Sequence, residues 1–355
     1  MQTLSSNFQL KHFNIKNRIV FPPVVCFHYA GADGIVTDRN VTHHRERASG
    51  PGIFITEATA VMKEGRLAPF QLGIWSDDHI AGLSRIAGTV KEAGAVSMIQ
   101  IHHAGLISPE SVNAFPAGPS PDENKPNSRS LSVDEIRIIK DSFIAGALRA
   151  KKAGFDGIEL HGAHGYLLNQ FASSFFNKRE DEFGGDLQGR LKLAAGIIRG
   201  IRALCGDEFI IGYRLGANAP SLGDGIEIAK YLETFGVDIL HSSHGGSLAN
   251  LPRTPKDFAY NWIVYCATQI KLHVNIPVIA VNEIKTAERA AYLIENGLVD
   301  FVALARPQLA DPQWANHVMN QVPVNECLSC KPRCRWFEDS ELCPAIRRLK
   351  QIADE

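Results

Sequence analysis

The repeated alternation of short apolar runs, rich in β-branched residues, with amphipathic stretches constrains the fold of this chain most. Each run is typical of a buried strand, and each is followed by a turn and a helical stretch. Strands that alternate with helices in this way form a parallel sheet. The pattern predicts strands over residues 18–21, 52–56, 96–101, 157–160, 209–214, 238–241, 277–280 and 301–304.

Helices are predicted between these strands, over residues 77–93, 132–153, 187–204, 225–235 and 286–296. Ser132 is followed three residues later by Glu135, which is the signature of a capping box at a helix start. Gly94, Gly154 and Gly297 each stand where a helix end favours a left-handed residue. Eight strand–helix units without a GxGxxG motif in the first turn predict an α/β fold, a closed (β/α)8 TIM barrel.

Three segments lie outside this repeat. Residues 1–16 predict a small β-hairpin that plugs the bottom of the barrel. Residues 108–130, rich in Pro, Ser and Asn, predict a long loop after the third strand. We expect two parts, a barrel domain over residues 1–322 and a short Cys-rich C-terminal extension over residues 323–355.

Charge and hydropathy exclude some functions. The net charge of −1 and the dispersed basic residues argue against a nucleic-acid partner. The first residues lack the apolar core of a signal peptide, and no apolar run is long enough to span a bilayer. We therefore expect a soluble cytoplasmic protein without a membrane partner.

Polar side chains end or follow seven of the predicted strands. In a TIM barrel the chemistry gathers at these carboxyl ends. The residues are Glu57, Gln100, His102, His103, His161, His164, Arg214, His241, His244, Asn282 and Arg306. The histidines suit a metal-dependent hydrolase, but Glu57 and Glu159 are the main carboxylates near these ends. A phosphate-bearing cofactor fits better, because Arg306 and the Ala305 backbone occupy the usual phosphate-binding corner.

Five segments resemble the old yellow enzyme family of NAD(P)H:flavin oxidoreductases. They are NRIVFPP (17–23), ITEATAV (55–61), LGIWSDD (72–78), IELHGAHGYLLNQF (158–171) and NKREDEFGG (177–185). The resemblance implies a barrel that binds FMN and is reduced by NAD(P)H. It further implies an ene-reductase, which reduces the C=C bond of an α,β-unsaturated carbonyl compound or related alkene. The family commonly forms homo-oligomers.

The resemblance assigns catalytic roles residue by residue. His161 and His164 resemble the pair that hydrogen-bonds the substrate carbonyl oxygen. Such donors stabilise the negative charge that develops on this oxygen as hydride arrives at the β-carbon. Tyr166 resembles the general acid that protonates the α-carbon.

The resemblance also implies cofactor contacts. Gln100 matches the side chain that contacts the flavin pyrimidine edge, and Arg214 matches the cation beside N1 and O2. Pro23, Val24 and Ala58 fall where the isoalloxazine is held, and Asn282 and Arg306 fall at the phosphate.

The chain departs from the family near the flavin O4 and N5 edge. The family usually has Thr or Cys there, whereas this chain has Val25 by the cleanest alignment. A shift of one residue would bring in Cys26, and Phe27 replaces a family Tyr. Redox tuning and substrate preference therefore stay open. We interpret His102, His103, His244 and Glu57 as structural.

Four cysteines crowd into the C-terminal segment in a C-x2-C-x3-C-x8-C pattern. They are Cys327, Cys330, Cys334 and Cys343. Four thiolates ligate a [4Fe–4S] cluster or zinc, and free thiols are the third possibility. The 2,4-dienoyl-CoA reductase and trimethylamine dehydrogenase branch of the family resembles this tail, with a longer final spacing. We hypothesise a cluster, served by a separate electron-donor protein because the chain ends twelve residues after Cys343.

Other functions remain open at this point. A flavin-dependent amine dehydrogenase or demethylase would use the same barrel and pass electrons through the cysteine site. A metal-dependent TIM-barrel hydrolase belongs to a different class and would use the histidines as ligands. A pure binding role leaves the polar strand ends unexplained.

Overall fold

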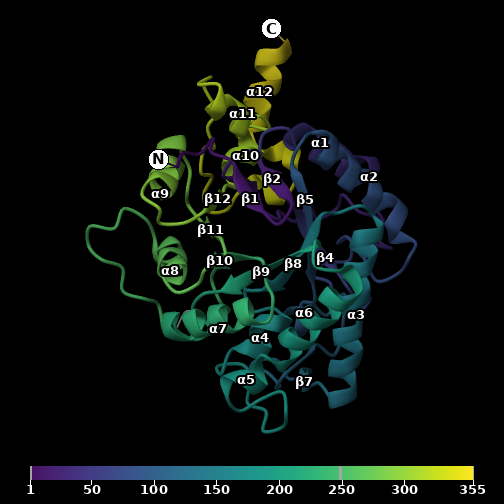
Figure 1. Cartoon of the computed structure of the whole chain (residues 1–355). Helices are drawn as coiled ribbons and strands as arrows, with labels where there is room; N and C mark the ends of the chain where they lie inside the picture. Colours follow the sequence, from purple (N-terminus) through teal and green to yellow (C-terminus); the bar gives the residue numbers. More distant parts are fainter. Residues whose placement is uncertain (1, 248–249, 355) are drawn as a thin grey trace.

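A closed parallel barrel forms the centre of the molecule (Figure 1). The computed structural model describes residues 2–247 and 250–354, and within these ranges eight strands pair in sequence order until the last pairs with the first. The strands are β3 (Ile19–Phe21), β4 (Ile53–Ala60), β5 (Val96–His102), β8 (Gly157–Gly162), β9 (Ile210–Gly216), β10 (Ile239–Ser243), β11 (Val278–Val281) and β12 (Phe301–Ala303). The predicted (β/α)8 barrel and its strands are confirmed.

Helices surround the barrel (Figure 1). The longer ones are α1 (Asp38–Arg47), α2 (His79–Glu92), α3 (Val133–Lys152), α6 (Lys192–Cys205), α7 (Leu222–Thr234), α8 (Trp262–Lys271) and α9 (Ala287–Glu295). The five predicted helices are confirmed within a few residues, except that residues 187–204 divide into α5 (Leu187–Arg190) and α6. Helices α1 and α8 are additional to them, and the buried side chains of α1 are mostly polar, so α1 lacks an apolar period.

The predicted helix ends are also confirmed. Ser132 and Glu135 form a reciprocal capping box at the start of α3. The glycines Gly94, Gly154 and Gly297 have φ angles of 78°, 92° and 64°. These left-handed residues end three helices and turn the chain directly into the next strand.

A β-hairpin closes the barrel at the amino ends of its strands, as predicted. Strands β1 (Phe8–Leu10) and β2 (Phe13–Ile15) pair antiparallel. Leu10 and Ile15 lie in one buried cluster with inward-facing side chains such as Val96. This apolar plug keeps water out from below and leaves the carboxyl ends as the place for polar chemistry.

Short elements complete the loops. They are α4 (Leu167–Ala172), the two-residue strands β6 (Ala117–Gly118) and β7 (Arg129–Ser130), and the 3-10 helices Lys63–Gly65 and Gly105–Ile107. Strands β6 and β7 pair with each other within the predicted loop 108–130. No helix of residues 2–247 and 250–354 is long and apolar enough to cross a membrane.

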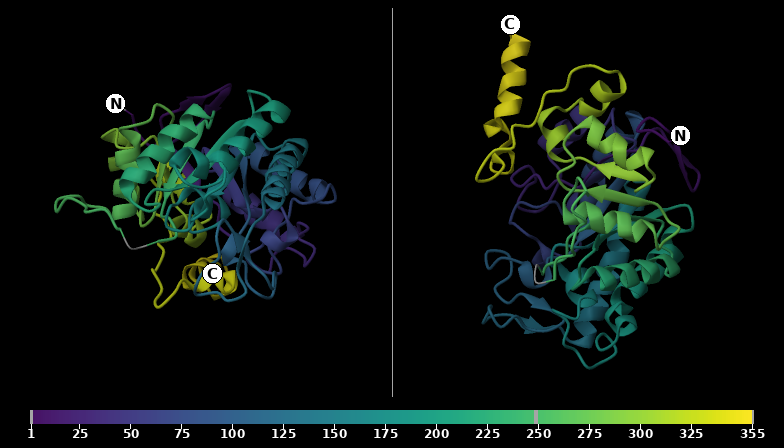
Figure 2. Two further views of the ribbon diagram at one scale, coloured as in Figure 1. Left: turned by 90° about the horizontal axis from the view of Figure 1, so that it is seen from below. Right: turned by 90° about the vertical axis from the view of Figure 1, so that its left-hand side faces the viewer.

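The C-terminal segment folds back onto the barrel. It contains α10 (Arg306–Ala310), α11 (Trp314–Met319), the 3-10 helices Arg335–Phe337 and Ser340–Leu342, and α12 (Pro344–Asp354), which projects from the body of the molecule (Figure 2). Trp336 and Cys343 share a buried cluster with Phe21 and Phe54 of the barrel. The Cys-rich extension therefore packs against the outer side of β3 and β4.

Helix α3 allows a matched test of the core. Phe143 is fully buried, whereas Ile138 on the same helix is 56% exposed. Phe143→Ala should lower the free energy of unfolding by about 3–5 kcal/mol, because it leaves a cavity in a packed interior. Ile138→Ala should change it by no more than about 0.5 kcal/mol. Urea unfolding followed by circular dichroism measures both, and equal losses would contradict this assignment of the core face.

Candidate active site

A cavity of about 310 Å³ opens at the carboxyl ends of the barrel strands. Its lining comes from many segments that are distant in sequence. The residues are Pro22, Pro23, Val24, Val25, Phe27, Ala58, Leu67, Gln100, His161, His164, Tyr166, Arg214, Val281, Ala305 and Phe337. All the sequence-predicted catalytic and cofactor residues are among them except Asn282 and Arg306.

Strand alternation brings the polar residues together. Successive side chains of a strand point to opposite faces, so every second residue enters the barrel. Directly opposite one another across the strands lie Gln100 with Glu159, and His161 with Arg214. His241 on β10 is also paired with Arg214. Polar groups from four consecutive strands therefore form layers above the apolar plug.

A sharp turn after β8 aims three side chains into the cavity. His164 and Gly165 have φ angles of 61° and 76°, and such left-handed residues reverse the chain. The turn is held because Gly165 N donates to Asn169 Oδ1 at 2.9 Å. As a result the ring of His161 lies 4.9 Å from that of His164 and 4.7 Å from that of Tyr166.

The two histidines are neutral hydrogen-bond donors. Burial lowers the pKa of His161 and of His164 well below its ordinary value, and nearby imidazoles and Arg214 lower it further. Ala163 N donates to His161 Nδ1 at 3.4 Å, which places the ring proton on Nε2. His164 Nε2 lies 2.7 Å from Ser243 Oγ. Neutral rings in this position can donate to an oxygen atom in the cavity.

Tyr166 keeps its proton at neutral pH. Burial raises the pKa of its hydroxyl, and Arg214 offsets this only in part. The ring also contacts His102, whose centroid is 4.7 Å away at a steep angle. A protonated phenol at the cavity wall can donate a proton to a bound group.

Arg214 is a buried cation that faces the cavity. Among the described residues its guanidinium forms no hydrogen bond or ion pair, and its Nε is a buried donor without a partner. Burial lowers its pKa, while the nearby Glu159 carboxylate raises it. An unpaired buried charge is costly, so this position fits an electron-rich group such as the pyrimidine edge of a flavin.

Val25, rather than Cys26, faces the cavity. Cys26 is buried, with its Sγ 3.5 Å from the carbonyl oxygen of Val24. Its backbone N–H donates to Glu57 Oε2 at 2.8 Å. Glu57 therefore holds the loop that carries Val24 and Val25, consistent with the structural role expected for it.

Several polar residues near the strand ends lie outside the cavity lining. His103 Nδ1 accepts from Gly105 N at 3.0 Å, which is a structural contact. Asn282 accepts from Asn261 Nδ2 at 2.8 Å, and Arg306 forms an ion pair with Glu283. Contact of Asn282 and Arg306 with a cofactor phosphate stays a prediction.

Some lining residues carry no signal in the sequence. Leu67 lies outside the segments with polar strand ends, Val281 is an apolar residue beside Asn282, and Phe337 belongs to the tail. Phe337 is 47% exposed in the structure, and only the return of the tail to the barrel brings it to the cavity.

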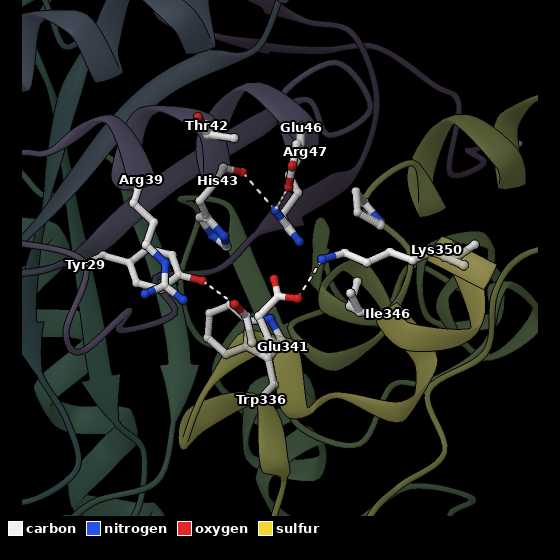
Figure 3. Close-up of a pocket in the computed structure, with 13 residues that line it drawn as sticks. Tyr29, Arg39, Thr42, His43, Glu46, Arg47, Trp336, Glu341, Ile346 and Lys350 are labelled. Atoms are coloured by element: carbon white, nitrogen blue, oxygen red, sulfur yellow. Dashed lines mark hydrogen bonds and ion pairs between the residues drawn. The ribbon is translucent and has the colours of Figure 1, made fainter. Parts of the chain in front are cut away.

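A second cavity, of about 370 Å³, lies between α1 and the tail (Figure 3). Tyr29 Oη and Ser340 Oγ are 2.7 Å apart across it, and Arg39 forms an ion pair with Asp339 at 3.3 Å. These contacts fasten the tail beside the loop that carries Val25, which explains how Phe337 reaches the candidate site.

The predicted metal site on Cys327, Cys330, Cys334 and Cys343 is not supported. Within the described part of the chain, no group of three or more His, Cys, Asp or Glu residues is placed to hold a metal ion. Cys343 instead packs in an apolar cluster with Trp336, and Cys327 and Cys334 lie against that cluster. Burial raises the pKa of the Cys334 thiol, and the other three thiols add to this.

The chain is similar to several known oxidoreductases. The pattern of the NADH:flavin oxidoreductase / NADH oxidase family matches residues 4–325. An NADH oxidase of Thermoanaerobacter brockii is 38% identical over 96% of this chain but 55% of its own length, so the chain spans about half of this relative. An NADPH dehydrogenase of Halalkalibacterium halodurans is 35% identical, over 88% of this chain and 92% of its own. The structure of an old yellow enzyme homologue from Zymomonas mobilis aligns with a TM-score of 0.78, at 25% identity, over 92% of this chain and 95% of its own.

The buried Glu57 predicts a pH dependence of stability. Burial raises its pKa from 4.5 to about 7. Its stabilising contribution is thus full below pH 4.5 and is lost as the pH rises through about 7. The Glu57→Gln variant has no carboxyl to ionise, so it lacks this loss. Its free energy of unfolding relative to that of the wild type should therefore increase between pH 5 and pH 8, by on the order of 3 kcal/mol.

Chemical denaturation at the two pH values measures this difference. Glu135→Gln is the control, because Arg129 lowers the pKa of Glu135 to about 2. The stabilising contribution of Glu135 is lost only as the pH falls below about 4.5. The change in the free energy of unfolding that Glu135→Gln causes should therefore be the same at pH 5 and pH 8. A constant difference for Glu57→Gln would show that its carboxyl is already ionised at pH 5.

Proposed function

Because this chain belongs to the NADH:flavin oxidoreductase / NADH oxidase family, which includes the old yellow enzymes, we propose that it is an ene-reductase. It reduces the C=C bond of α,β-unsaturated carbonyl compounds with electrons from NAD(P)H. One observation carries this proposal: two neutral imidazoles, a protonated Tyr166 and an Arg214 without a partner among the described residues face the same cavity.

The residues present fit FMN. Gln100 and Arg214 would hold the pyrimidine end, where Arg214 would find the electron-rich partner that the described residues do not supply. Pro23, Val24, Val25 and Ala58 would pack against the ring system, and Asn282, Ala305 and Arg306 would meet the phosphate. When bound, FMN supplies the hydride for the β-carbon.

His161 and His164 orient the substrate and stabilise developing charge. The substrate carbonyl oxygen accepts from the two ring N–H groups. Because the cavity is desolvated, these hydrogen bonds strengthen as negative charge grows on that oxygen. Neutral rings serve this purpose without a proton transfer to the oxygen.

Tyr166 completes the reaction. Its phenol transfers a proton to the α-carbon, so that the substrate gains one hydride and one proton and the C=C bond becomes a single bond. The raised pKa of Tyr166 keeps this proton available near neutral pH. Solvent then restores the phenol.

The geometry favours no second activity. An amine dehydrogenase would pass its electrons through the cysteine site, and the described residues do not assemble that site. A metal-dependent hydrolase would need a ligand group of histidines and carboxylates, and none is assembled in that part of the chain.

The histidine pair is tested by removing both rings. His161→Ala combined with His164→Ala should lower the rate of 2-cyclohexenone reduction by at least about 10²-fold, because donors to an oxyanion contribute that much each. The FMN content, measured by absorbance, should stay stoichiometric. Wild-type turnover in this double variant would refute the carbonyl-binding role.

Tyr166 is tested by removing one oxygen atom. Tyr166→Phe should slow 2-cyclohexenone reduction by about 10²–10⁴-fold, the usual contribution of a general acid. Reduction of the bound flavin by NADPH, followed by stopped-flow absorbance, should keep its wild-type rate. If both half-reactions slow equally, the tyrosine shapes the cavity and does not act as the proton donor.

A further inference from the structure

Below the candidate site, three buried polar side chains form a hydrogen-bonded chain across the barrel interior. Gln100 Nε2 donates to Glu159 Oε1 at 2.7 Å, and His241 Nδ1 lies 2.8 Å from Glu159 Oε2. Each of the three side chains belongs to a residue that is 1% exposed. Of the three, only Gln100 lines the cavity, so Glu159 and His241 act from behind it.

A glycine on β9 leaves space for the hydrogen bond between Glu159 and His241. Strand β9 lies between β8 and β10, and the residue opposite Glu159 on β9 is Gly212. A side chain at this position would point into the barrel, because its neighbours two residues away also do. A Cβ at Gly212 would lie 3.0 Å from Met98 Cε. With glycine there, Glu159 reaches His241 across the strand.

His241 is a neutral donor to the carboxylate. Burial lowers its pKa, and the opposing effect of Glu159 does not cancel this. Its Nδ1–H therefore satisfies one oxygen of Glu159, and the Gln100 amide satisfies the other. Since a carboxylate only accepts hydrogen bonds, this arrangement uses both oxygens.

The same hydrogen bonds disfavour an ion pair between Glu159 and Arg214. The two charges lie close enough to interact, yet no ion pair joins them in the described ranges. Glu159 is held by two other donors, so the Arg214 guanidinium remains available to the cavity. A direct ion pair would withdraw that guanidinium from any bound cofactor.

Glu159 also decides which way the Gln100 amide points. Because one N–H of Nε2 is committed to the carboxylate, Oε1 and the second N–H of Nε2 remain available to a ligand. A flavin pyrimidine edge presents an N–H between two carbonyl groups, so it needs an acceptor beside a donor. An amide held in this orientation supplies both.

We propose that Glu159 and His241 are positioning residues for the cofactor, which orient the Gln100 amide and oppose the charge of Arg214 at the pyrimidine end of the flavin. This inference rests on the proposed function, because it places FMN in the cavity. Glu159 thereby lowers the affinity of the bound flavin for electrons, and Arg214 raises it.

The sign of this effect follows from charge. Reduction of a flavin by two electrons and one proton adds a negative charge to the ring system. A nearby carboxylate disfavours that charge and a guanidinium favours it. Removal of the Glu159 charge should therefore raise the reduction potential.

Glu159→Gln tests the charge while it keeps both contacts. The side chain has the same shape, its oxygen can accept from Gln100, and its amide can donate to the other tautomer of His241. We expect the equilibrium constant for reduction of bound FMN to rise at least tenfold, which is about 30 mV for a two-electron couple. Anaerobic titration with a reference dye measures the potential.

Glu159→Leu tests the orientation. It removes the acceptor for Gln100, so FMN affinity, measured by fluorescence quenching, should fall about tenfold. Gln100→Leu should cause a similar fall. The double variant should bind no more weakly than Gln100→Leu alone, because the two residues act through one contact. Independent, additive losses would overturn the positioning role.

Asp311→Asn is the matched control. Asp311 is a buried carboxylate whose Oδ2 lies 2.8 Å from His317 Nδ1, and it does not line the candidate site. Its removal should leave the flavin potential unchanged. If Glu159→Gln binds FMN with the wild-type potential, the inference is wrong and the proposed function stands. If the wild-type protein does not bind FMN, the proposed function fails first.

Discussion

The buried guanidinium of Arg214, which has no partner among the described residues, constrains the rest of the site. An unpaired buried charge costs several kcal/mol, and binding of a complementary group recovers part of that cost. Burial keeps the rings of His161 and His164 neutral by lowering their pKa, and the charge of Arg214 lowers the pKa of both further. Arg214 therefore favours an electron-rich ligand and also supports the neutral, donating state of the two histidines.

The N-terminal hairpin and the C-terminal tail both help to enclose the candidate site. The hairpin plug closes the barrel beneath the polar layers, so Glu159 and His241 stay dehydrated. The tail is fastened beside the loop of Val25 through Tyr29 and Arg39, and it adds Phe337 to the cavity wall. The extension thus contributes to the cavity, and the metal site that the cysteine spacing predicts is not supported in the described part of the chain.

Much of the fold and most of the candidate site could be predicted from particular residues. The apolar periods located the eight strands, and glycines such as Gly94 marked helix ends, because both signals are local. Helix α1 escaped prediction because its buried face is built from polar residues such as Asn40 and His44. Phe337 and the chain from Gln100 to His241 escaped as well, because they depend on contacts between segments far apart in sequence.

The sequence by itself determined the barrel and the inward direction of its polar residues, because strand alternation and helix caps depend on near neighbours. It also supplied the motif that places His161, His164 and Tyr166 on one turn. Only the tertiary structure decided that Val25 and not Cys26 faces the cavity, and that Glu159 bonds to His241 rather than Arg214. The physical reason is that strand register and burial decide which polar groups meet in a low-dielectric interior, and these arise only when distant segments pack together.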